Sequence, residues 1–170
     1  MQLRAAVTRR CGSTLFCLAK GSRGAGGVSI FIKFARKYFE EAVRDLQRAK
    51  RALGFEDYPQ AAFYAQQCVE KAVEAMVEVK KRVVHNHGPE LIAVFSEVFD
   101  DEWREEYGVV VQALEYLQEY YTRARYPSLF RGEVYGPSEV VTEDIARRGV
   151  ELAEKALGVV EDFLRRSGVI

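Results

Sequence analysis

Apolar residues recur at helical spacing over most of the chain after residue 34. The first stripe predicts a helix over about 34–53, and Gly54 ends it. Pro59 then opens a second helix at a first-turn position, where the missing N–H of proline is harmless. Alanine is unusually frequent on the stripe of this second helix, which lets another helix approach it closely. We take this alanine-rich face as the candidate surface for dimerisation.

Three more helices follow from the same spacing and from their terminal residues. Pro89 starts a short helix that runs to about residue 99. Asp100 or Asp101 is placed to cap the next helix, predicted over about 102–122. Thr142 caps the last one, which has acidic residues in its first turn.

The connections are brief, and one longer loop is expected over residues 127–141, after Pro127 stops the preceding helix. No strand pattern competes strongly, although 28–34 alone resembles a strand. The sequence therefore predicts an all-α fold, an antiparallel up-and-down bundle of four to five helices over residues 31–170. Residues 1–30 are glycine-rich and lack a sustained period, so we expect a flexible basic tail outside the bundle.

Charge is unevenly distributed along the 170 residues. The whole chain carries 25 basic and 25 acidic residues, for a formal net charge of zero. Eight of the basic residues and none of the acidic ones lie in residues 1–39, which leaves the remainder at −8. An acidic domain is a poor general binder of nucleic acid, so any phosphate site must be local. A basic arm that contacts phosphate is the alternative interpretation of the tail.

The cysteines and histidines indicate neither a disulfide nor a metal site. No pair among Cys11, Cys17 and Cys68 has zinc-type spacing, and Cys68 lies on an apolar helix face as a small buried residue. His85 and His87 have no evident third ligand. We therefore expect no metal and no cofactor. No segment has the length of uncharged apolar sequence that a membrane span needs, and the reducing compartment implied is the cytoplasm.

Two basic runs are predicted to meet at one end of the bundle. If consecutive helices alternate in direction, the second and fourth helices end on the same side. Lys80, Lys81 and Arg82 follow the second helix, and an acid-free run with three arginines and Tyr126 follows the fourth. Arginine binds phosphate bidentately and tyrosine offers a face for stacking. The alternative is that both runs only complement the negative ends of helix dipoles.

The segment Tyr58–Ala72, with the letters YPQAAFYAQQCVEKA, resembles the second-helix signature of the HEPN (higher eukaryotes and prokaryotes nucleotide-binding) domain. The His87 loop and the segment Tyr120–Pro127 are similar to its sacsin-like branch, and the resemblance spans about 34–164. It implies an antiparallel helical bundle that commonly forms a homodimer. It also implies a minimal nucleotidyltransferase partner, and either nucleotide binding or metal-independent RNA cleavage.

The resemblance also implies a set of site residues. Cleaving members carry Arg, four to six residues and then His, a spacing that Arg82 and His87 satisfy. There the histidine would take a 2′-hydroxyl proton and the arginine would stabilise charge on the phosphate. For nucleotide or RNA phosphate, the predicted binding residues are Lys81, Arg123, Arg125, Tyr126, Gln67 and Lys71.

Three functions remain open at this point. The first is a phosphate-binding module that acts with a nucleotidyltransferase partner, as in a toxin–antitoxin pair. The second is a metal-independent endoribonuclease, and the third is a non-catalytic interaction bundle. For Gln67 and Lys71, one turn apart on a helix, the alternative role is polar contact across the bundle or a dimer face.

Overall fold

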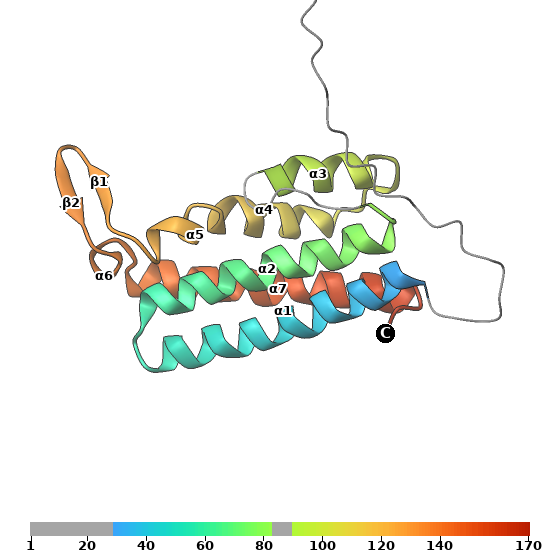
Figure 1. Ribbon diagram of the computed structural model, residues 1–170, viewed down its shortest axis with the longest axis horizontal. Coiled ribbons are helices and arrows are strands. Elements are labelled where there is room, and N and C mark those ends of the chain that lie inside the picture. The colour runs from blue at the N-terminus through green and yellow to red at the C-terminus, as the bar shows by residue number, and fades with distance from the viewer. Residues whose placement is uncertain (1–28, 83–89) are drawn as a thin grey trace, which may run out of the picture.

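The computed structural model of the chain describes residues 29–82 and 90–170. Predictions that concern residues 1–28 and 83–89, among them His85, His87 and two of the cysteines, lie outside the described residues. The elements, in chain order, are α1 (Ile30–Gly54), α2 (Tyr58–Val79), α3 (Glu90–Phe99), a 3-10 turn η1 (Asp100–Glu102), α4 (Tyr107–Leu117), α5 (Tyr120–Arg123), β1 (Ser128–Phe130), β2 (Glu133–Tyr135), α6 (Pro137–Val140) and α7 (Glu143–Arg166) (Figure 1).

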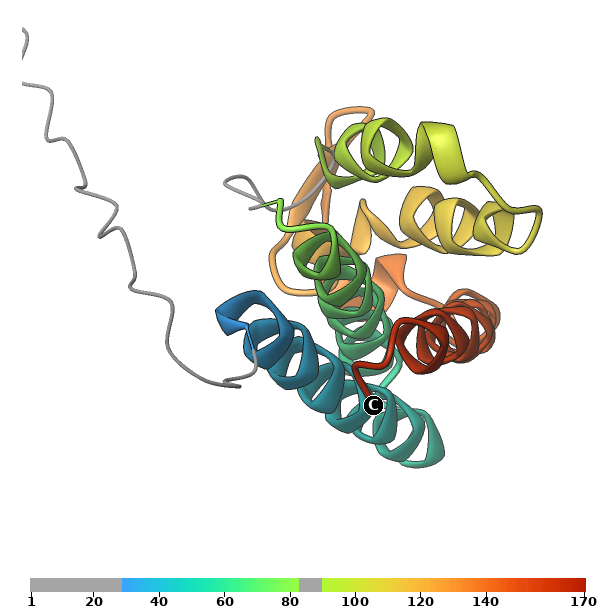
Figure 2. The same ribbon diagram turned by 90° about the vertical axis from the view of Figure 1, so that its right-hand side faces the viewer.

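Three long helices, α1, α2 and α7, pack side by side, and α4 lies on α2 and α7 (Figures 1 and 2). The approach of α4 to α7 is close at Gly149, where an added Cβ would lie 3.0 Å from Leu117 Cδ2. The all-α helical bundle predicted from the apolar spacing is therefore confirmed. In the described part of the chain, no helix is long and apolar enough to cross a membrane.

The alanine-rich stripe of α2 lies inside this bundle. Ala61, Ala65 and Ala72 are fully buried in the same core as Ala42 and Ala49 of α1. Small side chains let the two long helices approach each other, as the sequence suggested. The proposal that this face forms the dimer surface is wrong, because the chain itself covers it.

Helix termini follow the expected capping chemistry in part. Thr142 Oγ1 accepts a hydrogen bond from the Ile145 N–H, so the predicted cap of the last helix is confirmed. The first helix begins at Ile30, four residues earlier than expected, which also removes the strand considered for 28–34.

The long helix predicted over 102–122 is divided into η1, α4 and α5. Asp100 and Asp101 lie within η1 and do not cap the following helix. Trp103 adopts an extended ψ of 137°, and its ring contacts Phe95 and Tyr107 with centroids 6.4 Å and 5.9 Å apart. Packing of these aromatic rings accompanies the break that helical spacing alone did not reveal.

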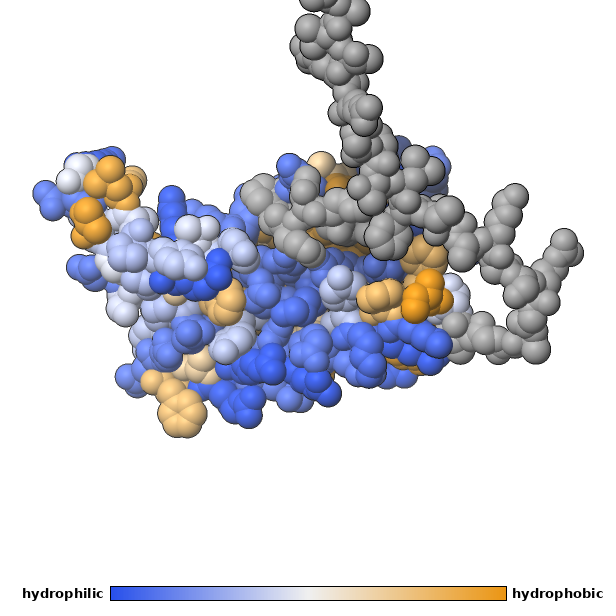
Figure 3. Space-filling model, viewed as in Figure 1, coloured by the Kyte–Doolittle hydropathy of each residue, from blue (hydrophilic) through white to orange (hydrophobic). Residues whose placement is uncertain are grey.

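The loop expected over 127–141 contains a β-hairpin and the short α6. β1 and β2 pair antiparallel, with Leu129 opposite Val134. Between them, Arg131 and Gly132 have φ of +51° and +89°, the positive values that tight hairpin turns require at both central positions. The hairpin projects from one end of the bundle, and apolar surface gathers on it (Figures 1 and 3).

Helix direction separates the two basic runs. α3 runs in the same direction as α2: Leu91 lies beside Gln66 in the middle of α2, whereas the end of α3 reaches the end of α2. The next helix, α4, runs antiparallel to α2, so α5 lies near the N-terminus of α2 (Figure 1). The prediction that both runs meet at one end is wrong, because it assumed that every helix reverses direction.

Candidate phosphate-binding site

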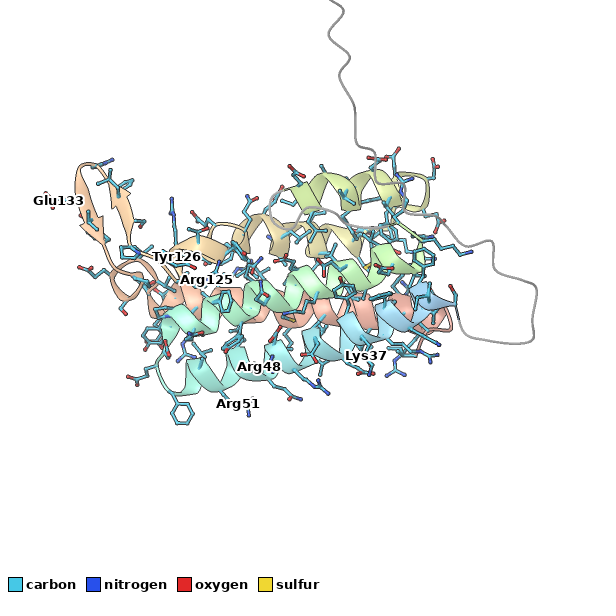
Figure 4. All side chains as sticks on the ribbon, in the orientation of Figure 1. Lys37, Arg48, Arg51, Arg125, Tyr126 and Glu133 are labelled. Carbon is cyan, nitrogen blue, oxygen red and sulfur yellow. The ribbon has the colours of Figure 1, made fainter. Side chains whose placement is uncertain are left out.

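Arg125 lies among three aromatic rings just after α5. Its guanidinium carbon is 4.2 Å from the ring centroid of Tyr121, 5.0 Å from that of Phe63 and 5.1 Å from that of Tyr126. Its Nε also donates a hydrogen bond of 2.7 Å to the carbonyl oxygen of Tyr121. The rings and the carbonyl hold the guanidinium in a defined place at the end of the bundle from which the hairpin projects (Figure 4).

The local sequence explains this arrangement. Tyr120 and Ala124, one turn apart, are buried and anchor α5 to the bundle. Burial is the main cause that raises the pKa of Tyr120 to about 12. Tyr121 and Arg125, one position further on, therefore lie together on the outer side of the same turn. From α2, Phe63 completes the set of rings.

The charge of Arg125 is not neutralised within the described part of the chain. Arg123, two residues earlier, forms an ion pair of 2.7 Å with Glu119. Neither Arg125 nor Arg131 makes an ion pair within the residues that the structure describes. A guanidinium that faces rings and one carbonyl keeps donors for an external anion, and phosphate matches its planar fork.

Gln67 and Lys71 line an adjacent groove on α2. The groove has a volume of about 280 Å³, and Tyr121 borders it as well as contacting Arg125. Lys71 Nζ donates to Asp45 Oδ2 at 2.5 Å and to Gln67 Oε1 at 3.1 Å. Asp45 is only 2% exposed and also receives a 2.5 Å contact from Arg48. Lys71 thus balances a buried carboxylate between α1 and α2, and phosphate binding by Gln67 and Lys71 stays a prediction.

Acidic side chains make the floor of this groove unlike the Arg125 site. Glu70 and Glu74 line it and are both buried. Burial first, and then the charges of Glu74, Glu78 and Glu70, raise the pKa of Tyr38 on the facing helix α1. An anion is therefore favoured near Arg125 and disfavoured deeper in the groove.

The other basic run lies at the far end of α2. Phe63 and Val79 are about 24 Å apart along the helix axis, at 1.5 Å per residue. Arg82 forms an ion pair with Glu97 at 2.8 Å, and Lys80 forms one with Glu102 at 2.5 Å. Lys81, with φ of +58°, occupies the left-handed position that ends α2. Lys81 and Arg82 are thus remote from Arg123, Arg125 and Tyr126.

Two parts of this region escaped sequence reasoning. Phe63 was treated only as part of a signature, although its position one turn before Gln67 places it on the polar side of α2. The hairpin was treated as loop, although Gly132 lies between two short segments that each contain apolar residues, 128–130 and 133–135, and glycine there favours a turn.

The titratable side chains that the structure describes form no metal cluster. In residues 29–82 and 90–170, no group of three or more His, Cys, Asp or Glu side chains is arranged to hold an ion. Cys68 is fully buried, which confirms its structural role, and burial raises its thiol pKa to about 12.

The geometry defines a helical-bundle protein that carries an arginine–aromatic cluster on an exposed turn. Comparison with known proteins identifies the family. Residues 35–163 match the HEPN domain, so the chain belongs to the HEPN family.

Three known proteins are similar to the chain over most of its length. The protein named Putative toxin MJ1304, from Methanocaldococcus jannaschii, is 32% identical over 137 residues, which cover 79% of this chain and 90% of the relative. The crystal structure of TT1696 from Thermus thermophilus has a TM-score of 0.59 at 29% identity, and covers 75% of this chain and 96% of that one. The crystal structure of ST0689, an archaeal HEPN homologue, has a TM-score of 0.58 at 25% identity, with 76% and 97% covered.

Proposed function

We propose that this HEPN protein is the toxin-like half of a toxin–antitoxin-like pair and binds the phosphates of a nucleotide or of RNA at Arg125. The observation that carries the proposal is the position of the Arg125 guanidinium, held by three rings and a carbonyl and without an ion pair among the described residues. The toxin name of the Methanocaldococcus jannaschii relative supports the first half of the proposal.

Binding at this site follows from the orientation of Arg125. Its N–H groups donate to two oxygens of one phosphate, while the exposed ring of Tyr126 offers a stacking face. Arg123 contributes less, because Glu119 already neutralises part of its charge. Gln67 and Lys71 bind at most the rim of a ligand that extends along α2.

Titration of labelled ATP or a short RNA against the purified protein tests this proposal. Arg125→Ala is expected to lower affinity at least tenfold, about 1.4 kcal/mol, and Arg125→Lys to restore part of it as a point charge. Arg51→Ala is the matched control, because it removes an exposed arginine from the last turn of α1 at the same end of the bundle. Equal affinities of the wild type and Arg125→Ala would refute the assignment.

The partners follow from the same proposal. A minimal nucleotidyltransferase is the proposed antitoxin, and the Tyr120–Pro127 segment supports assignment to the sacsin-like branch. The protein is proposed to act as a homodimer in the cytoplasm, where the thiol of Cys68 stays reduced. Light scattering of the protein alone, and co-purification with a nucleotidyltransferase encoded beside it, test these two associations.

A metal-independent endoribonuclease is the second candidate, favoured by the spacing of Arg82 and His87. Incubation with structured RNA in EDTA is then expected to give 2′,3′-cyclic phosphate ends, and His87→Ala to abolish them. Cleavage that persists in His87→Ala would remove these residues from the role. If neither nucleotide nor RNA raises the melting temperature, the non-catalytic interaction bundle is the function that stands.

A further inference from the structure

A second hollow lies beside Arg125, between the hairpin and the end of the bundle. It has a volume of about 260 Å³, and its lining comes from α5, both strands and α6: Arg123, Ser128, Leu129, Phe130, Tyr135 and Val140. Both aromatic residues are accessible to solvent, since Phe130 is 58% exposed and Tyr135 is 36% exposed.

Strand register gives the two sides of the hairpin different characters. Ser128 is opposite Tyr135 and Phe130 is opposite Glu133, so these four side chains lie on one side of the hairpin. Leu129 and Val134 are opposite each other and form the other side. Ser128, Phe130 and Tyr135 line the hollow from the first side and Leu129 lines it from the second, whereas Glu133 and Val134 do not line it.

Residues that line the hollow are close to Arg125 along the chain. Ser128 is three residues after Arg125, so their Cα atoms are separated by at most about 11 Å. Arg123 lines the hollow itself, and the Arg131 guanidinium is 5.2 Å from the Phe130 ring centroid. Cationic groups thus border a hollow that has aromatic walls.

We propose that this hollow is a nucleobase subsite: it takes the base of a nucleotide, or of one residue of single-stranded RNA, whose phosphate is bound by Arg125. The inference rests on the proposed function and extends it to the base. The base stacks on Phe130 and Tyr135, and Ser128 and Arg123 supply hydrogen-bond groups at its edge.

The arrangement favours this class of ligand over others. A lipid chain or an apolar peptide gains nothing from the three arginines around the hollow, whereas a nucleotide pairs an aromatic ring with an anion in one molecule. Every base has a π-face, so all four bases can stack on aromatic side chains. The subsite therefore requires a base but discriminates weakly among bases.

Two ligands separate the subsite from the phosphate site. AMP carries phosphate and base, and ribose 5-phosphate carries the phosphate without the base; both are titrated by calorimetry. Phe130→Ala and Tyr135→Ala are each expected to weaken AMP binding about fivefold to tenfold and to change ribose 5-phosphate binding less than twofold. Arg125→Ala is expected to weaken both ligands.

Control variants keep the interpretation clear. Val134→Ala removes an apolar side chain from the other side of the same hairpin and is expected to leave both affinities unchanged. Phe130→Tyr and Tyr135→Phe preserve the rings and are expected to preserve AMP binding. Equal loss of both ligands in Phe130→Ala, or undiminished AMP binding in Phe130→Ala and Tyr135→Ala, would overturn the subsite. Binding of ribose 5-phosphate that depends on Arg125 would in either case leave the proposed function standing.

Discussion

The two basic runs have similar composition and nearly opposite surroundings. Lys80 and Arg82, at the end of α2, face Glu102 and Glu97 at 2.5 Å and 2.8 Å. Arg125, after α5, faces aromatic rings and a backbone carbonyl. At the first end the positive charges are balanced within the chain, and at the second a positive charge remains for an external anion.

This difference teaches that topology decides whether the chain itself neutralises a basic run. The sequence places each run after a helix, where the dipole favours cations. The acids that neutralise Arg82 and Lys80 come from α3 and η1, which reach the end of α2 only because α3 runs parallel to it. The sequence around Lys80 and Arg82 does not predict these ion pairs, because both acidic partners lie more than ten residues further along the chain.

The largest effect is expected for a cation that lies between the two ends. Lys71→Met removes one partner of the buried carboxylate of Asp45 and leaves Arg48 as its ion-pair partner among residues 29–82 and 90–170. We expect a loss of about 2 kcal/mol of unfolding free energy, since a buried charge that loses a partner is costly. Urea denaturation measures it, with Lys155→Met, an exposed lysine on α7, as the control. Nucleotide affinity is expected to change less than twofold; unchanged stability with lost affinity would place Lys71 in the phosphate site.

A single substitution makes the surroundings of Arg125 resemble those of Arg82. Tyr121→Glu replaces a ring 4.2 Å from the guanidinium by a carboxylate, while the hydrogen bond to the Tyr121 carbonyl survives because it involves backbone. Tyr121→Gln is the uncharged control. Opposite charges about 4 Å apart attract by about 1 to 4 kcal/mol across the range from water to a protein surface. We expect Tyr121→Glu to bind labelled ATP about tenfold more weakly than Tyr121→Gln, and equal affinities would contradict the role of the free charge.

Much of the bundle could be predicted from the sequence, because core packing produces a regular signal. The 3.6-residue spacing of apolar positions located α1, α2, α3 and α7, and Thr142 marked the start of the last of these. The break at Trp103 could not be predicted in this way. It coincides with the packing of that ring on Phe95 and Tyr107, which lie eight residues before it and four after it. The same spacing is typical of one face of an unbroken helix, so the apolar pattern gave no sign of the break.

The candidate site was predicted less completely than the fold. Arg125 and Tyr126 were found because they are close together in sequence and of the right type. Phe63 comes from a helix about sixty residues earlier, and only the packing of α5 near the start of α2 brings it to the guanidinium. The prediction that Lys81 and Arg82 lie at this site was wrong for a similar reason. Because α3 runs parallel to α2 and does not reverse direction, the two basic runs lie at opposite ends of the bundle.

The smallest effect on stability and affinity is expected when the two carboxylates that pair with Lys80 and Arg82 are replaced. In Glu97→Gln/Glu102→Gln both ion pairs are lost, and because all four side chains are at least a quarter exposed, stability is expected to change by less than about 1 kcal/mol. The freed cations are expected to increase affinity for labelled ATP about twofold at low salt, and less at high salt because screening weakens the contacts. The gain stays small because no aromatic ring of the described residues holds the Arg82 guanidinium as three rings hold that of Arg125, so the freed charge is not oriented. Glu161→Gln/Glu151→Gln, which removes two carboxylates from the exposed side of α7, controls for net charge. A tenfold gain in the first variant that the control lacks would mean that neutralisation alone separates the two ends and that the aromatic rings around Arg125 contribute nothing to binding.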